Sequence, residues 1–275
     1  MPKNCVAVVV LWLGTVLLTA CVSEQSYIGS QLNTPVNQAD YSAAARTRIT
    51  LGLNYLQRGD TVQAKYNLER AAEQAPALPE VHTALAWYFQ QAGELQQAED
   101  SYRRALHHGP DNGDVNHNYG TFLCQQQQFD KAEALLRKAI NAPGYLKVAE
   151  SYENLALCAL QQQQFEHASE YLHSSLAHNL RSSAVLNLAT VHYAMGNEPA
   201  AQELLDKLPQ PSARSLLLSR LVAGRQQQPE LARMAEQQLL HGYADSDEAV
   251  LLRQQQLDNS EFEKLRRQYL QQQTE

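Results

Sequence analysis

The stretch LGLNYLQRGD at residues 51–60 decides the fold, because its pattern returns as LAWYFQQAGE at residues 85–94. In both stretches Leu precedes a small residue, an aromatic residue follows the small residue by three places, and a Gly follows it by seven. The two small residues, Gly52 and Ala86, lie 34 positions apart. Recurrence at a fixed period of this size is the signature of an array of repeated structural units.

The recurrence extends over most of the chain. Small residues continue at steps close to this first one, and an alanine follows each of them twelve places later. The two series are Gly52, Ala86, Gly120, Ala156, Ala189 and Ala64, Ala98, Ala132, Ala168, Ala201. Apolar residues flank the members of both series at the spacing of one helix face, so every unit is predicted to contain two amphipathic helices.

The composition agrees with an all-α protein and excludes several functions. Ala, Leu and Gln dominate, and a formal net charge of -7 leaves no concentration of Lys and Arg for nucleic acid. The chain lacks the zinc-protease His motif, the phosphate-binding Gly-Lys-Ser/Thr loop, the Gly-x-Ser-x-Gly elbow and the calcium loop. We therefore expect no enzyme, no metal or other cofactor, no small-molecule substrate and no nucleic-acid partner.

The combined pattern resembles the tetratricopeptide repeat, a helix pair of about 34 residues. The resemblance implies an all-α, right-handed solenoid of about six helix pairs with a C-terminal capping helix. Units are expected within residues 43–247, at about 45–78, 79–112, 113–148, 149–181, 182–215 and 216–247, and the cap in residues 248–275. The sixth unit is the weakest, and its expected markers are Ala223, Pro229 in the turn, Ala235 and Leu239.

The N-terminus predicts export from the cytoplasm. An apolar run from Cys5 to Leu18 has the length of a signal peptide and is too short to span a bilayer. The run ends in Leu-Thr-Ala-Cys, which resembles the bacterial lipobox. Residues 1–20 are therefore interpreted as a lipoprotein signal peptide and Cys21 as the residue that carries the covalent lipid. An ordinary signal peptide, with Cys21 incidental, is the alternative.

The residues after Cys21 predict where the anchored protein resides. Val22 occupies the position where an Asp would resemble the inner-membrane retention signal, which favours the outer membrane and its periplasmic face. Residues 21–42 are rich in Ser, Gln, Asn and Thr and show no periodic apolar face. They are predicted to form a flexible lipidated tether, because such a composition cannot bury a core.

Cys124 and Cys158 remain once Cys5 and Cys21 are assigned to the signal peptide and the lipid. They lie 34 positions apart, near the middle of the first helices of adjacent units. Because the periplasm is oxidising, a disulfide between these two units is reasonable. The alternative is a pair of buried apolar residues, since the two cysteines differ by two places in repeat register and their Cα atoms could lie too far apart.

Two local features are interpreted as structural. The glutamine runs 125–128 and 161–164 occupy the same turn of successive units and are predicted to be solvated. Asp114 is predicted to be the N-cap of the helix that follows its turn.

The resemblance to tetratricopeptide repeats also implies a binding groove, lined by the second, fifth, ninth and twelfth positions of each unit. In the first two units these positions are Arg46, Ile49, Leu53, Leu56 and Glu80, Thr83, Trp87, Gln90. Ile49, Leu53 and Leu56 would form an apolar stripe beside Trp87, with Thr83 and Gln90 adding polar contacts, and such exposed stripes mark binding surfaces. Burial against the tether or a neighbouring helix is the alternative.

The lipobox, the tether and the repeats together resemble the pilotin lipoproteins of type IV pili, the PilF/PilW family. Residues 51–60, followed by Ala64, are particularly similar to the first repeat of that family. The resemblance implies a partner, the type IV pilus secretin, which the lipoprotein would carry to the outer membrane and help to multimerise. The second hypothesis is a repeat lipoprotein that serves as an adaptor for peptidoglycan hydrolases or for the β-barrel assembly machinery.

Overall fold

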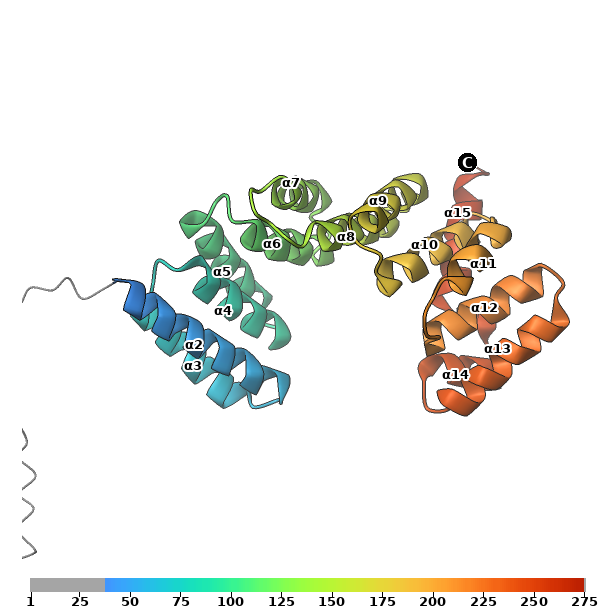
Figure 1. Ribbon diagram of the computed structural model, residues 1–275, viewed down its shortest axis with the longest axis horizontal. Coiled ribbons are helices and arrows are strands. Elements are labelled where there is room, and N and C mark those ends of the chain that lie inside the picture. Colours follow the sequence, from blue (N-terminus) through green and yellow to red (C-terminus); the bar gives the residue numbers. More distant parts are fainter. Residues whose placement is uncertain (1–37, 275) are drawn as a thin grey trace, which may run out of the picture. The chain divides into compact units, whose positions relative to one another are not determined.

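The computed structural model describes residues 38–274, which form fourteen α-helices and one 3-10 helix (Figure 1). The predicted signal peptide, Cys21 and residues 21–37 of the predicted tether lie outside the described residues. Residues 38–42, which were also assigned to the flexible tether, instead form the start of α2. The helices are α2 (Gln38–Gln57), α3 (Thr61–Gln74), α4 (Pro79–Gln91), α5 (Leu95–His108), α6 (Gly113–Gln125), α7 (Phe129–Ile140), α8 (Val148–Gln161), α9 (Phe165–His178), α10 (Ser182–Ala194), α11 (Glu198–Asp206), α12 (Ala213–Arg225), α13 (Pro229–Gly242), α14 (Asp247–Arg253), η1 (Leu257–Asn259) and α15 (Glu261–Gln272).

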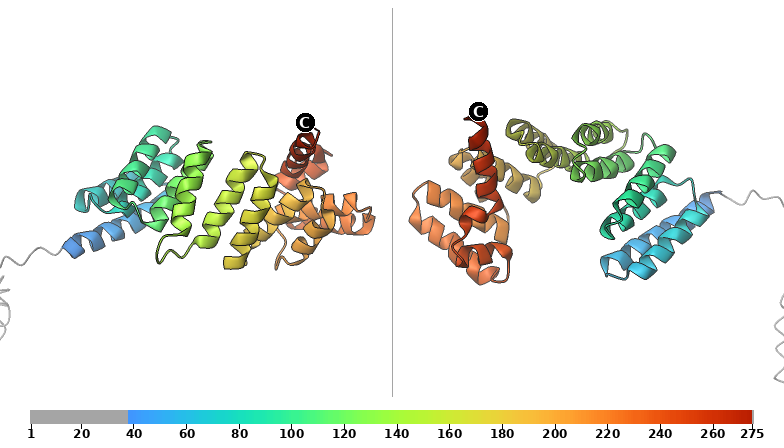
Figure 2. Two further views of the ribbon diagram at one scale, coloured as in Figure 1. Left: turned by 90° about the horizontal axis from the view of Figure 1, so that it is seen from above. Right: turned by 180° about the vertical axis from the view of Figure 1, so that it is seen from behind.

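The helices from α2 to α13 form six consecutive pairs, which we call units 1 to 6. Each pair packs against the next in chain order, as Figure 2 shows. This arrangement confirms the predicted all-α repeat fold. Within residues 38–274, no helix is both long enough and apolar enough to cross a membrane.

Small residues set the distance between the two helices of a pair. A Cβ added at Gly52 would lie 2.8 Å from Cγ of Leu68, and one added at Gly120 would lie 2.9 Å from Cγ of Leu136. The second series of alanines, from Ala64 to Ala201, is fully buried. Leucines and aromatic residues then fill the space that this close approach leaves, so neighbouring units share clusters of buried apolar residues.

The turn inside each pair requires a left-handed backbone. Gly59, Gly93 and Gly196 supply it in units 1, 2 and 5, with φ between 77° and 80°. In units 3 and 4 the equivalent residues are Gln127 and Gln163, at φ of 59° and 58°. The glutamine runs are turns, as predicted, but each also contains one residue in a conformation that favours glycine.

Unit 6 departs from the predicted register. In the other units the left-handed residue follows the small marker by seven places, whereas Gln227 follows the predicted marker Ala223 by only four. Counting back seven places from Gln227 puts Arg220 at the position that a small residue holds in the other units. The position that holds Leu68 in unit 1 and Leu136 in unit 3 holds Glu236 in unit 6. Arg220 Nε and Glu236 Oε2 lie 3.9 Å apart. Pro229 is the first residue of α13, not a turn residue, and α12 begins at Ala213, before the predicted boundary.

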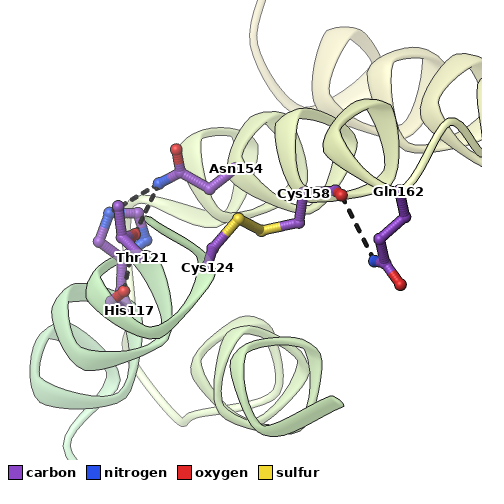
Figure 3. The surroundings of a disulfide bond; sticks show 6 residues. All are labelled: His117, Thr121, Cys124, Asn154, Cys158 and Gln162. Carbon is purple, nitrogen blue, oxygen red and sulfur yellow. Dashed lines mark hydrogen bonds between the residues drawn. A yellow bond between two sulfur atoms is a disulfide. The ribbon is translucent and has the colours of Figure 1, made fainter. Parts of the chain in front are cut away.

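A disulfide links units 3 and 4. Cys124 of α6 and Cys158 of α8 are bonded, and their Cα atoms lie 5.7 Å apart, so the offset in repeat register does not separate them too far (Figure 3). Beside the bond, Asn154 Nδ2 donates to Thr121 Oγ1 at 2.9 Å. The two first helices are therefore joined both covalently and by side-chain hydrogen bonds.

The last helix, α15, packs against α10 of unit 5. Phe262 is buried in the core that units 5 and 6 share, and Tyr193 Oη donates a hydrogen bond to Glu263 Oε1. Glu263 also accepts two hydrogen bonds from Arg225 at 3.1 Å. A buried carboxylate with these partners is satisfied, so α15 is a firmly seated part of the predicted cap.

Candidate partner-binding groove

A cavity of about 820 Å³ lies over the first helices of units 1, 2 and 3, and we call it the groove. It contains five of the six predicted contact residues and several that were not predicted. Its lining consists of Ile49, Leu53, Leu56, Gln57, Glu80, Thr83, Ala84, Trp87, Gln91, Tyr102, Asn112, Asp114, Val115, Asn118 and Lys147. The predicted stripe Ile49, Leu53 and Leu56 therefore meets Thr83 and Trp87 in one cavity.

Helix geometry explains why these side chains share one face. Leu53 follows the small residue Gly52 by one place, and Trp87 follows Ala86 by one place, so both point away from the tight contact within their own pair. Leu53 and Leu56 are partly buried, whereas Trp87 is 45% exposed. A large aromatic ring beside leucines, still open to solvent, can bury further apolar surface when a partner arrives.

Gln90 is the one of these six residues that does not line the groove, and Arg46, another predicted position, also lies outside the lining. Its Nε2 donates to Gln125 Oε1 at 2.7 Å, and its Oε1 accepts from Tyr102 Oη at 3.1 Å. Gln90 therefore links α4 to α5 and to unit 3, and the next residue, Gln91, lines the groove instead. One residue along a helix rotates the side chain by about 100°, which accounts for the exchange.

The charged residues of the groove are paired. Glu80 Oε1 lies 3.2 Å from Arg46 Nη2, and Asp114 Oδ1 lies 2.7 Å from Lys147 Nζ. Asp114 was predicted to be an N-cap, but the cap of α6 is Asn112, whose side chain accepts from the backbone N–H of Val115. The groove therefore offers an apolar floor with neutralised charges at its edge.

Unit 3 contributes groove residues that the sequence prediction missed. Asp114, Val115 and Asn118 come from α6, and Lys147 comes from the loop before α8. A signal was present, because Asp114 follows Glu80 by one full repeat and so occupies the same position of its unit.

Titration in and near the groove is governed by burial. Desolvation raises the pKa of Tyr102, which keeps its hydroxyl a hydrogen-bond donor. Desolvation lowers the pKa of His117, with Lys147 adding to the effect. Within residues 38–274 no group of three or more His, Cys, Asp or Glu side chains is placed to hold a metal ion.

Comparison with protein-family models places the chain in a class. Three tetratricopeptide-repeat models match residues 49–113, 89–143 and 182–207. These regions include α4, α6 and α10, whose small residues set the repeat register. The protein is a tetratricopeptide-repeat protein, a class of scaffolds for protein interaction.

Relatives narrow the class to a family. Type IV pilus assembly protein PilF of Pseudomonas aeruginosa is 34% identical over 212 residues, or 76% of this chain and 82% of that protein. An uncharacterized protein of Haemophilus influenzae is 37% identical over 150 residues, or 54% of this chain and 78% of the relative. The chain belongs to the PilF/PilW family of tetratricopeptide-repeat proteins.

Solved structures agree with this assignment. The structure of Pseudomonas aeruginosa PilF superposes with a TM-score of 0.68 at 33% identity, covering 78% of this chain and 99% of that one. PilW, described as a widely conserved type IV pilus biogenesis factor, superposes with a TM-score of 0.69 at 27% identity, covering 76% and 97%. The similarity therefore extends over nearly the whole of both relatives.

Proposed function

We propose that the protein is an outer-membrane pilotin of type IV pilus biogenesis. In this role it binds the pilus secretin through the groove, and a lipid on Cys21 holds the complex at the periplasmic face of the outer membrane. Membership of the PilF/PilW family supports the pilus context, and the groove supports recognition of a protein segment. The lipobox-like residues before Cys21 support the anchor.

The observation that carries the proposal is the open apolar surface of the groove. Trp87 is 45% exposed beside Leu53 and Leu56, and the charges around them are already paired. A surface of this kind gains most from an apolar segment, because the aromatic ring and the leucines lose contact with water when it binds. Binding here and lipid anchoring elsewhere would bring the secretin to the membrane and concentrate its subunits for ring assembly.

The groove is tested by a double substitution, Leu53→Ser with Trp87→Ser, compared with a matched control, Val62→Ser with Tyr66→Ser. The control residues are 75% and 48% exposed on α3 and lie outside the groove. The full-length proteins are compared for binding of the secretin's periplasmic region by isothermal titration calorimetry. Loss of binding by at least about tenfold in the groove variant alone supports the proposal. Equal binding by both variants, with unchanged circular dichroism, would refute it.

The anchor is tested by Cys21→Ala in cells. The variant should still bind the secretin but leave it away from the outer membrane, because the groove and the lipid have separate roles. Membrane fractionation followed by detection of secretin multimers measures the outcome. Normal secretin rings in the outer membrane of the variant would contradict the assigned role of the lipid.

A further inference from the structure

The first helix of unit 4 repeats the groove chemistry of unit 1. Three residues follow the small marker by one, four and five places in each unit, and the residue types are the same. They are Leu53, Leu56 and Gln57 in unit 1, and Leu157, Leu160 and Gln161 in unit 4. Because equivalent positions of repeated helices face the same way, unit 4 presents a second surface of the same kind.

A segment of the chain, α15, lies beside this second surface. Leu265 and Gln268 of α15 share a cavity of about 390 Å³ with Leu157, Leu160 and Gln161 of α8. Further along the same helix, Tyr269 lies edge-on to Phe165 with 5.2 Å between ring centroids. The apolar residues of α15, Phe262, Leu265 and Tyr269, fall at i, i+3 and i+7, which is one face of a helix.

Acidic residues in the first turn fix the orientation of α15. Glu261 pairs with Arg214 at the start of α12, and Glu263 pairs with Arg225 at its end. The N-terminal turn of α15 therefore lies over unit 6, and Tyr269 near its other end lies over unit 4. The helix crosses the units in the order 6, 5, 4.

The groove holds a neutralised ion pair, Asp114 with Lys147, at the equivalent place. Counted back from the left-handed turn residue, Arg214 of unit 6 corresponds to Asp114 of unit 3, and Arg225 corresponds to Gln125. Neither arginine that holds the acidic turn of α15 has a counterpart in unit 3. Asp114 already pairs with Lys147, so acidic residues in the first turn of a bound helix would lose contact with water there without gaining a partner.

We propose that the groove of units 1 to 3 receives a single amphipathic α-helix of the partner protein, seated across the first helices as α15 is seated on units 4 to 6. The partner helix places leucine or aromatic side chains at i, i+3 and i+7 against Leu53, Leu56 and Trp87. Its first turn is basic or neutral, unlike that of α15, because unit 3 lacks counterparts of Arg214 and Arg225, which receive the acidic residues of α15. This inference rests on the proposed function and specifies the kind of segment that the groove recognises.

The test uses fluorescently labelled peptides of residues 258–274 as helix probes, with full-length protein in detergent and anisotropy as the readout. One peptide has the native sequence and the other carries Glu261→Lys and Glu263→Gln. The charge-altered peptide should bind, and the native peptide should bind at least about tenfold more weakly. Leu53→Ser in the protein should abolish binding of the altered peptide, whereas the matched change Leu157→Ser in unit 4 should leave it unchanged.

A charge exchange gives the sharpest control. Asp114→Arg makes unit 3 resemble unit 6 and should reverse the preference, so that the native peptide binds more tightly than the altered one. The inference is overturned if neither peptide binds, if both bind equally, or if Leu157→Ser abolishes binding, since the peptide would then have exchanged with α15. Concentration-dependent self-association of the full-length protein through α15 would also overturn it.

The proposed function is tested separately, by measuring how the secretin region binds to the same protein preparations. If the secretin region binds in a manner that needs Leu53 and Trp87 while no peptide binds, the pilotin role stands and the helix inference falls. If the altered peptide binds in the groove while the secretin region does not bind at all, the partner assignment falls and the helix preference of the groove stands.

Discussion

Four glutamines hold the left-handed backbone conformation in the turns of this protein. Gln127, Gln163, Gln227 and Gln255 have φ between 56° and 59°, while the equivalent residue in units 1, 2 and 5 is Gly. For a side chain with a Cβ this conformation costs about 1 kcal/mol or more, whereas Gly adopts it without steric cost. The glutamine runs are therefore places where stability can be gained.

Gln163→Gly should raise the free energy of unfolding by about 0.5–1 kcal/mol, because it removes the steric cost of the left-handed turn before α9. The midpoint of urea unfolding, followed by circular dichroism, measures the change. The neighbouring Gln162→Gly is the control, since φ at Gln162 is -89° and glycine offers no relief there. A Gln163→Gly protein less stable than the wild type would show that the glutamine side chain stabilises the turn.

His82 makes the stability of unit 2 sensitive to acid. The side chain is buried, its Nε2 lies 2.7 Å from the carbonyl oxygen of Pro76, and its ring stacks on His108. Burial lowers the pKa of His82 in the folded state, an effect that the hydrogen bond with Pro76 partly offsets and that the charges of His108 and Arg104 reinforce. Above pH of about 6.5 both the folded and the unfolded states are neutral, and below it the unfolded state takes up the proton first.

Stability should therefore fall as pH decreases below about 6.5, and His82→Gln should reduce that fall by up to about 1 kcal/mol at pH 5.5. Glutamine can still donate to Pro76 but does not titrate. Urea unfolding at pH 8 and pH 5.5 provides the comparison. Burial also lowers the pKa of His117 and His192, so part of the acid sensitivity should remain in the variant. An identical pH dependence in both proteins would contradict this role for His82.

Close packing of helix pairs can be tested at two glycines in different surroundings. A Cβ at Gly120 would lie 2.9 Å from Leu136 Cγ and 3.1 Å from the carbonyl oxygen of Ala132, whereas a Cβ at Gly242 would meet nothing within 4 Å. Gly120→Ala should destabilise the protein by about 1–2 kcal/mol, since overpacking outweighs the gain in helix propensity. Gly242→Ala should stabilise it by up to about 1 kcal/mol. Thermal unfolding that moves in the same direction for both variants would contradict this account.

The disulfide acts on the pair of elements that it joins, α6 and α8. Replacing Cys124 and Cys158 with serine should lower the free energy of unfolding by about 2–4 kcal/mol, because the loop between the two cysteines is no longer closed in the unfolded chain. Denaturation with and without reductant measures the same effect in the wild type. Alkylation of two thiols in the unreduced, freshly purified protein would show that the bond is not formed.

The features that recur in every unit could be predicted from the sequence. Contacts and register changes that occur only once could not. The spacing of Gly52, Ala86 and their equivalents predicted the helix pairs, because close approach of two helices demands a small residue at the same place in every unit. The left-handed glutamines could not be predicted from composition, since glutamine has no preference for that conformation. In unit 6, Arg220 occupies the marker position, so counting residues from unit 5 placed the marker at Ala223.

The residues of the candidate site could be predicted from the sequence where they occupy repeated positions. Leu53, Leu56 and Trp87 occupy repeated positions, and the structure brings them together. Gln90 was misplaced because its hydrogen bonds to Gln125 and Tyr102 turn it towards the neighbouring unit. The seat of α15 rests on ion pairs between residues far apart in the chain, such as Glu261 with Arg214, and no local pattern encodes these.

At the scale of the whole molecule, two similar surfaces differ in whether a helix of the chain lies on them. Units 4 to 6 hold α15, and their equivalents in units 1 to 3 leave the groove open. The disulfide between units 3 and 4 joins the two halves at the boundary. The repeat array thus provides one surface for its own last helix and keeps one for a partner, which is the central claim of the proposed pilotin role.

The most direct measurement of that claim is site-specific photo-crosslinking in cells that express the full-length protein. A photoreactive residue at Gln91, which is exposed and lines the groove, is compared with one at Tyr66 on α3, which is exposed outside it. The account predicts a crosslink from position 91 to the type IV pilus secretin and none from position 66. A secretin crosslink from position 66 alone, or a crosslink from position 91 to a peptidoglycan hydrolase or a barrel-assembly subunit, would contradict it.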